Sequence, residues 1–421
     1  MTVGAVLVGA SSSRKPGYLR AHRTSAAIYQ VLLGLAFLGS ALAGPLSHVQ
    51  LGSISGQGLL TIGIALLSWG LLIASWPIRD RTEGSLRPLA AFTGWVVLSL
   101  FWSPAITTGA QNVLVWTVFV TSLFVSRRFS SVVPWLRPWT AKLLVTSTVV
   151  AVLLYGLSML WSGLGTNVLW GNRTFAMFCL PGLAWFLAGW RQRQPNSLWA
   201  SVGILTMIAL SLSRTGLAMA AVLLVLCQVL GRARRRLVRA AVGVALAGAV
   251  VAGAVHFVAP LRERFTIESG SDEESDLNAY SSGRLAVWSV VVPSALESPW
   301  VGKGAGAGRA LVAETFPEVL GHPHSDYLAV FHDNGLVGLC LFLVSIVHLL
   351  RMCRRGWMHA RDPLAARLGL ASLLGLSGAA MLMVIENVLV MVFVMAPLGL
   401  LIGTALATPR QAATLARRPA S

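Results

Sequence analysis

Two histidines stand close together in the stretch His-Pro-His-Ser-Asp-Tyr-Leu, residues 322–328, which ends the only long polar interval of an otherwise apolar sequence. A neutral imidazole in a polar segment can take a proton from a hydroxyl group, so His324 and His322 are candidate general bases. A His-x-His pair can instead bind a metal ion. No third or fourth ligand follows at a familiar spacing, so we rank a metal site well below a general base and expect neither a metal nor a cofactor.

Three further residues near the histidines are candidates for binding a substrate. Asp326 has two equally supported interpretations: it orients a histidine or the acceptor, or it caps the N-terminus of the helix that follows. Tyr327 comes next in the same stretch. Gly304 lies in the glycine run 302–308, which does not match the Gly-x4-Gly-Lys-Ser/Thr phosphate loop. The run predicts a tight, flexible backbone close to the substrate.

Three arginines stand where few charges are expected. Arg214, in Ser-Leu-Ser-Arg-Thr-Gly (211–216), joins two apolar segments, and an ionised residue at that depth is costly, so we favour a function over an arginine that snorkels to lipid headgroups. For Arg173, in Gly-Asn-Arg-Thr (171–174), the two interpretations are even. Arg284 would be unremarkable alone. Together the three could converge on one anion, and guanidinium forks match the oxygens of a lipid-linked phosphate or diphosphate.

Composition assigns these residues to a membrane protein. The chain of 421 residues is 55% hydrophobic and 11% charged, with a mean hydropathy of +0.71, whereas soluble domains carry roughly 25% charged residues. A spanning helix needs about 20 mostly apolar residues. The sequence therefore predicts an all-α polytopic membrane protein, one integral domain over 1–421, with about twelve spans at 28–46, 58–76, 88–103, 111–126, 142–161, 174–190, 198–212, 215–231, 237–258, 334–350, 365–384 and 387–407.

The basic residues predict the orientation. With both termini in the cytoplasm, 26 of the 33 Lys and Arg fall in inner segments, as the positive-inside rule expects. The net charge of +18 then reflects orientation and attraction to anionic lipids, which argues against nucleic-acid binding. The histidines lie in one large external loop, about 259–333, between the ninth and tenth spans. The chemistry is therefore expected outside the cytoplasm, where ATP is absent.

The large loop has two distinct parts. An acidic run, Asp272, Glu273, Glu274 and Asp276, could bind a divalent cation, but its Ser, Gly and Asn neighbours favour a solvated turn. Residues 285–297 predict a short amphipathic helix lying in the membrane interface. The sequence shows no internal repeat, and the single large loop argues against a transporter of two equivalent halves. We expect one external lid over one site.

The motifs in the second half of the chain resemble those of the O-antigen ligase and polymerase superfamily of bacterial membrane glycosyltransferases. The resemblance covers mainly residues 205–345. Its motifs are Ser-Leu-Ser-Arg-Thr-Gly, Ser-Gly-Arg-Leu-Ala-Val-Trp, Pro-Trp-Val-Gly-Lys-Gly-Ala-Gly, His-Pro-His-Ser-Asp-Tyr-Leu and Asn-Gly-Leu-Val-Gly-Leu. Each motif is weak alone, and their order around one external loop is fairly specific. The family commonly has Asn after the histidine, where this chain has Ser325.

The resemblance implies a GT-C-type helical fold and transfer of a glycan from an undecaprenyl-diphosphate carrier to a hydroxyl of an acceptor glycan or glycolipid, without metal or nucleotide. By the matching motifs, Arg214 and Arg284 would hold the diphosphate and His324 would be the catalytic histidine, with a weaker claim for His322. Arginines that stabilise the leaving diphosphate and a base that deprotonates the acceptor fit a single inverting displacement.

Two alternatives stay open at the level of sequence. A ligase and a polymerase share these motifs and differ in the acceptor, and the sequence does not decide between them. A lipid-linked glycan flippase would need polar residues running through the helix interiors. Few are found, and they gather at one face, which favours an enzyme.

Overall fold

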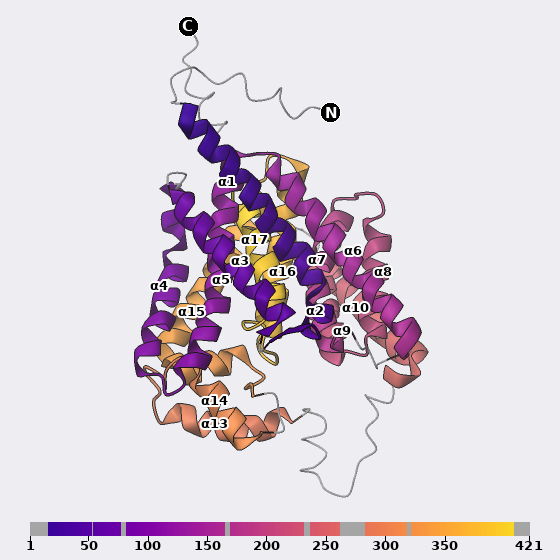
Figure 1. Ribbon diagram of the computed structural model, residues 1–421. Helices are drawn as coiled ribbons and strands as arrows, with labels where there is room; N and C mark the ends of the chain where they lie inside the picture. Colours follow the sequence, from indigo (N-terminus) through magenta and orange to yellow (C-terminus); the bar gives the residue numbers. More distant parts are fainter. Residues whose placement is uncertain are drawn as a thin grey trace, which may run out of the picture.

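The chain folds as a bundle of apolar helices with two short helices laid across one end (Figure 1). The computed structural model describes residues 16–52, 54–76, 81–164, 169–230, 236–261, 283–317 and 321–407. Its only strands in these ranges, β1 (Gln50–Leu51) and β2 (Ile54–Ser55), form a two-stranded antiparallel ladder. The helices in chain order are α1 (Pro16–Gly34), η1 (Leu35–Gly39), α2 (Ala43–Ser47), α3 (Gly56–Ala74), η3 (Arg81–Leu86), α4 (Arg87–Leu98), η4 (Ser99–Trp102), α5 (Ile106–Val132), α6 (Leu136–Ser162), α7 (Asn172–Arg191), α8 (Ser197–Leu210), α9 (Arg214–Val229), α10 (Arg236–Phe257), α13 (Arg284–Leu296), α14 (Ala307–Thr315), α15 (Asp326–Met358), α16 (Pro363–Leu382) and α17 (Val392–Leu406).

The prediction of an all-α polytopic membrane protein is confirmed. Within the described residues, seven helical segments are long and apolar enough to cross a membrane: Gly56–Ala74, Gly84–Trp102, Ile106–Val132, Leu136–Ser162, Val238–Phe257, Asp326–Met358 and Pro363–Leu382. The other five predicted spans overlap helices that are shorter or less apolar, among them α7, α8, α9 and α17. The count of twelve therefore stays a prediction, as do the domain boundaries.

The centre of the bundle is formed by α16 and α17, which the other helices surround (Figure 1). Small residues bring the backbones together here. A Cβ atom at Gly399 or Gly403 of α17 would overlap carbonyl groups of α5, at Phe119 and Leu123. Close approach of helix backbones through small residues four positions apart is a frequent way to pack helices in lipid, where apolar burial between helices gains little.

Helix α15 is a hairpin of two helical arms rather than one straight span. Gly335 interrupts it with φ 64° and ψ −170°. The rings of Tyr327 and Phe342 lie 5.7 Å apart, although fifteen residues of straight helix would separate them by about 22 Å. The short arm, residues 326–334, therefore folds back against the long arm, residues 336–358. The His-Pro-His stretch precedes the short arm, so it lies at the end of that arm that is remote from the Gly335 turn.

The lid, residues 283–317, docks onto this interruption through backbone hydrogen bonds. The amides of Leu336 and Val337, which begin the long arm, donate to the carbonyls of Pro299 and Trp300. At the end of the short arm, the carbonyls of residues 332 and 333 accept from the amides of Lys303 and Gly304. The helix ends created by the break thus find their partners in the lid, as buried backbone groups must.

The predicted lid helix at 285–297 is confirmed as α13, residues 284–296. A small apolar cluster of Val287, Val291 and Val312 joins α13 to α14. The predicted acidic run at 272–276 lies outside the described residues. Because α13 begins with Arg284, the contacts that dock the lid also determine where this arginine stands.

We expect Gly335→Ala to weaken the docked lid. A Cβ atom there would overlap the carbonyl of Trp300, and the positive φ is unfavourable for alanine, so the substitution should cost at least about 1–3 kcal/mol. A lower thermal unfolding midpoint of the detergent-solubilised protein measures the effect. Gly63→Ala is the matched control, because a Cβ at Gly63, inside α3, meets nothing within 4 Å. Equal midpoints for the two variants would contradict the docking role of Gly335.

Candidate active site

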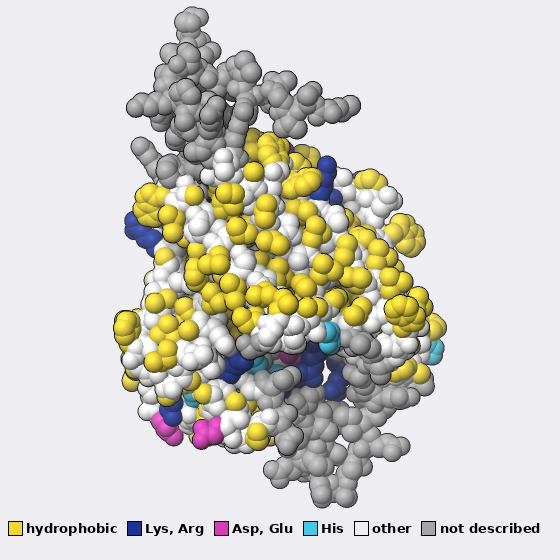
Figure 2. All heavy atoms as spheres, viewed as in Figure 1, with side chains coloured by type: hydrophobic (Ala, Val, Ile, Leu, Met, Phe, Trp, Pro, Cys, Tyr) yellow, Lys and Arg dark blue, Asp and Glu magenta, His cyan; other side chains and the backbone are white. Residues whose placement is uncertain are grey.

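Charged side chains gather in a hollow between the lid and the bundle (Figure 2). Helices α7, α9, α13 and α15 all begin in this region, with Arg173 at the second position of α7, Arg214 at the first of α9 and Arg284 at the first of α13. A helix N-terminus carries unpaired amides and a partial positive charge. Arginines stand at three such starts, so the hollow is electropositive. We call this hollow the recess.

A buried carboxylate, Glu386, stands among the three arginines. Arg284 Nη2 lies 2.6 Å from Glu386 Oε1, and Arg173 Nη1 lies 3.9 Å from the same oxygen. Thr215, next to Arg214, donates its hydroxyl to that oxygen at 3.3 Å. The pKa of Arg284 is lowered by burial and by the nearby charges of Arg173 and Arg214, while Glu386 opposes this. Arg173 and Arg284 thus meet at one carboxylate with Arg214 nearby, and their convergence on a substrate anion stays a prediction.

The turn before Arg214 is strained in a way that fixes its position. Leu212 is 2% exposed and has a φ of 56°, in the left-handed region that a leucine rarely adopts. Ser213 then caps α9, its hydroxyl accepting from the amide of Gly216 at 3.1 Å. A Cβ at Gly216 would overlap Ala176 of α7. The close contact joins α9 to α7, so the starts of both helices, with Arg214 and Arg173, are held side by side.

His324 is held in an unusual backbone conformation at the edge of the recess. Its φ is 53°, a left-handed value that costs a non-glycine residue of the order of 1–2 kcal/mol. The flanking backbone holds it there: the Trp288 indole donates to the Pro323 carbonyl at 2.8 Å, and the Asp326 amide donates to the Met383 carbonyl at 2.8 Å. Strain maintained from both sides is typical of residues whose side chain has a functional position.

The surroundings of His324 favour a neutral imidazole. Burial lowers its pKa, and the charges of Arg284 and Arg173 lower it further, while Glu386 raises it. Nδ1 lies 3.4 Å from the amide nitrogen of Asn387, and Nε2 makes no hydrogen bond with any residue the structure describes. A neutral ring with one nitrogen open is the state that a general base requires.

His322 lies close to His324 and is also neutral. Burial lowers its pKa to about 4, with smaller contributions from Arg309 and His324. A base with so low a pKa accepts a proton less readily than His324 does. The structure therefore keeps both histidines as predicted candidates and supplies a reason to prefer His324.

Asp326 does not cap its helix, so the N-capping interpretation is wrong. The cap is Ser325, whose hydroxyl accepts from the amide of Leu328 at 3.3 Å. Asp326 is 3% exposed, and its Oδ2 accepts from the amides of Val388 and Leu389 at 2.6 and 3.0 Å. The carboxylate thus orders the loop that carries Glu386 and Asn387, which leaves its predicted orienting role open.

Two other predicted substrate-binding residues are engaged in packing. The Tyr327 hydroxyl donates to the carbonyl of Ala380 at 2.8 Å. Gly304 has a φ of 94°, and a Cβ there would overlap the backbone of Ser103. The glycine run is thus tightly packed against the start of the α5 segment. Contact of either residue with a substrate stays a prediction.

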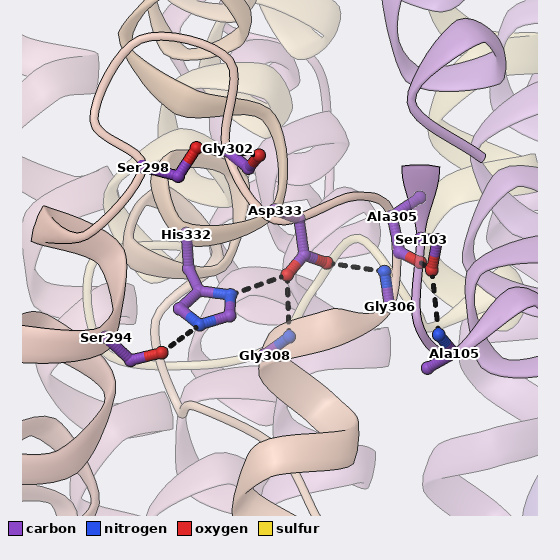
Figure 3. A network of polar contacts seen from close by, with 10 residues as sticks. All are labelled: Ser103, Ala105, Ser294, Ser298, Gly302, Ala305, Gly306, Gly308, His332 and Asp333. Atoms are coloured by element: carbon purple, nitrogen blue, oxygen red, sulfur yellow. Dashed lines mark hydrogen bonds and ion pairs between the residues drawn. The ribbon is translucent and has the colours of Figure 1, made fainter. Parts of the chain in front are cut away.

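The glycine run 302–308 is held by a buried network of hydrogen bonds around Asp333 (Figure 3). Its two carboxylate oxygens accept from the amides of Gly306 and Gly308, each at 2.7 Å, and from His332 Nδ1 at 2.9 Å. His332 Nε2 then accepts from the hydroxyl of Ser294, 3.0 Å away in α13. The order Ser–His–Asp is that of a hydrolase triad. His332 is only 1% exposed and both oxygens of Asp333 bind amides, so the network fits a latch between lid and bundle.

Glu386 and Asn387 were not among the residues predicted from the sequence. The signal that could have found Glu386 is simple: it is the only acidic residue in the apolar stretch 363–407. An ionisable residue within such a stretch is a functional candidate. The boundary between the predicted spans 365–384 and 387–407 falls at this point, so Glu386 lies outside both spans. The Asp333 latch has no local signature, because its amide partners Gly306 and Gly308 come from the preceding loop.

The fold and recess together define a multi-pass membrane protein with an electropositive site beside a neutral histidine. Residues 199–343, about a third of the chain, match the family model described as O-antigen ligase. The match spans Arg214, Arg284 and His324 and confirms the resemblance to the O-antigen ligase and polymerase superfamily. No curated protein is significantly similar to the chain. Within the described residues, no three His, Cys, Asp or Glu side chains group as metal ligands would.

We expect Asp333→Asn to loosen the lid. An asparagine amide cannot accept on both sides, so the amide of Gly306 or Gly308 would lose its partner, at a cost of about 1–3 kcal/mol. Limited proteolysis should then cut the lid faster, and the thermal midpoint should fall. Glu314→Gln, an exposed position on α14, serves as the control. Unchanged proteolysis of Asp333→Asn would contradict the latch.

Proposed function

We propose that the protein transfers a glycan from an undecaprenyl-diphosphate carrier to a hydroxyl of an acceptor glycan or glycolipid, at the outer face of the bacterial cytoplasmic membrane. The observation that carries the proposal is the recess, where Arg173, Arg214 and Arg284 meet beside His324. The family match supports glycosyl transfer of the O-antigen ligase type in surface-polysaccharide assembly. The carrier, the mechanism and the individual roles are our own inference.

The arginines and helix starts suit a diphosphate leaving group. Three arginines against one carboxylate leave an excess of positive charge in the recess, which attracts a diphosphate. As the bond to the sugar breaks, negative charge grows on the leaving oxygen, and fixed cationic donors stabilise that charge. Glu386 orients Arg284 before the substrate arrives, because an unpaired guanidinium beside a membrane would otherwise turn toward water.

His324 is the proposed general base. It removes the proton from the acceptor hydroxyl as the oxygen attacks the anomeric carbon, and the carrier diphosphate leaves from the opposite side. A single displacement of this kind inverts the anomeric configuration and needs no covalent intermediate, metal or nucleotide. His322, Asp326, Tyr327 and Gly304 are retained as proposed contacts to the substrates. A GT-C-type fold and cytoplasmic termini belong to the same proposal.

A second function, flipping of the intact lipid-linked glycan, uses the same anion site without cleavage. The strained His324 beside the arginines favours the transferase, since a transporter has no use for a general base at that place. Ligation and polymerisation both fit the recess. They differ only in what delivers the acceptor hydroxyl.

We expect His324→Ala and Arg214→Ala to insert and fold but to lose glycan transfer. Removal of a general base costs about 10²–10⁴-fold in rate, and removal of one donor to a developing anion costs about 10²–10³-fold. The measurement is release of carrier diphosphate from a lipid-diphosphate glycan by the purified protein, together with formation of a longer or transferred glycan.

The control for this experiment is His359→Ala, since His359 is exposed just after α15 and bonds only to the carbonyl of Arg355 within the described residues. Unaltered turnover by His324→Ala would remove the base assignment. Movement of uncleaved lipid across vesicles by the unaltered protein, with no release of diphosphate, would establish the flippase instead.

The pH profile of transfer should report on Glu386. Because the pKa of His324 is lowered, the acid limb of kcat/KM is expected below the ordinary histidine value of about 6.5. Glu386 raises this pKa, so Glu386→Gln should move the limb to still lower pH. The comparison is Glu297→Gln, an exposed lid carboxylate bonded to Lys303, which should leave the limb in place. A limb that moves to higher pH in Glu386→Gln would refute the proposed electrostatic coupling.

A further inference from the structure

A small cavity lies behind the short arm of α15, separate from the arginines. It has a volume of about 70 Å³, several times the roughly 10–15 Å³ that one water molecule needs. Its walls come from α4, α5, the glycine run, the short arm and the loop before α17. Phe92 and Trp116 supply apolar rings, and Asn112, Asp326 and Asn334 supply polar groups.

The polar groups on this wall include two oxygens that lack partners in the described residues. Asn334 is 4% exposed, and its side-chain oxygen is buried without a hydrogen bond. Asp326 uses Oδ2 for the two loop amides, and its Oδ1 has no hydrogen bond to any described residue. A buried acceptor without a donor costs about 1–3 kcal/mol. Both residues line the cavity, so a ligand there should donate hydrogen bonds.

The loop between α16 and α17 connects this cavity to the recess. Glu386 and Asn387 contact Arg284 and His324, respectively. The next residues, Leu389 and Val390, line the cavity. Asp326, whose carboxylate binds the loop amides, is only two residues from His324. The cavity wall and the base are therefore joined by one loop and by two residues of the chain.

On this geometry we propose that the cavity is an acceptor subsite that seats a hydroxyl-bearing substituent of a neutral sugar. A hydroxyl group donates to the Asn334 oxygen and exchanges a hydrogen bond with Asp326 Oδ1, while the rings of Trp116 and Phe92 suit the C–H surface of a sugar. The volume admits a hydroxymethyl or similar group and excludes a whole glycan. The assignment to an acceptor rests on the proposed transferase function.

The direct test uses methyl glycosides of glucose, galactose, mannose and N-acetylglucosamine as probes of the purified full chain in detergent. Saturation-transfer NMR should detect binding of at least one of them. Asn334→Ala removes the unpaired oxygen, and Asn112→Ala alters the same cavity from α5, so that either variant can serve if the other fails to fold. Loss of a neutral hydrogen bond corresponds to about fivefold weaker binding. Gln111→Ala, whose exposed side chain bonds to Arg309 instead, should bind as the unaltered protein does.

The second measurement is transfer, with the lipid-linked repeat extracted from the producing cells as donor and the methyl glycoside that binds as a separately varied acceptor. Asn334→Ala should raise the acceptor KM about fivefold and leave the donor KM unchanged. The subsite would be overturned if no glycoside binds or if all variants bind equally. Binding that disappears when Na⁺ and K⁺ are replaced would also overturn it, because it would indicate a cation site. If glycosides bind as expected but the unaltered protein releases no carrier diphosphate, the proposed function and the acceptor assignment fail while the sugar site stands.

Discussion

The ion pair between Arg284 and Glu386 is the contact on which the site depends. It joins the first residue of the lid helix α13 to the loop between the two central helices, at 2.6 Å and with both side chains largely buried. A buried charge without its partner is strongly unfavourable, so neither residue can leave this position cheaply. Arg284 lies inside the stretch 199–343 that matches the family model, and Glu386 lies outside it. The pair therefore requires that lid and bundle fold together.

The interruption of α15 explains how the lid reaches that position. Breaking a helix exposes amides and carbonyls that water cannot fully satisfy near a bilayer. Here the backbone of residues 299–304 supplies the partners, and Asp333 binds the glycine amides that follow. The glycines serve this docking, since the positive φ of Gly302, Gly304 and Gly306 lets the run follow the surface of α15 and α5 closely. The lid is consequently an integral part of the fold.

The sequence predicts the fold class and the clustering of the arginines well, because both follow from strong local signals. Apolar segments separated by basic turns indicate a helical membrane protein, and arginines that break this pattern indicate a site. The sequence does not predict the hairpin of α15, since the apolar stretch 334–350 looks like one span and the short arm ahead of it reads as loop. It also misses Glu386 and the Asp333 latch. These residues act through partners 25 or more positions away or through a loop whose boundary the apolar pattern cannot locate, so only the packed structure brings them together.

In the proposed reaction, the departure of the diphosphate and the deprotonation of the acceptor need opposite electrostatic conditions. The recess provides both conditions close together. A diphosphate is stabilised by positive charge, whereas a histidine base is weakened by it, because nearby arginines lower its pKa. Glu386 moderates this conflict: it contacts Arg284 directly and raises the pKa of His324 at the same time. Without a carboxylate here, three arginines would hold the leaving group but leave the histidine a poorer base. In the proposed reaction, the placement of one acidic residue between the arginines and the histidine is therefore the feature that lets a single site serve both substrates.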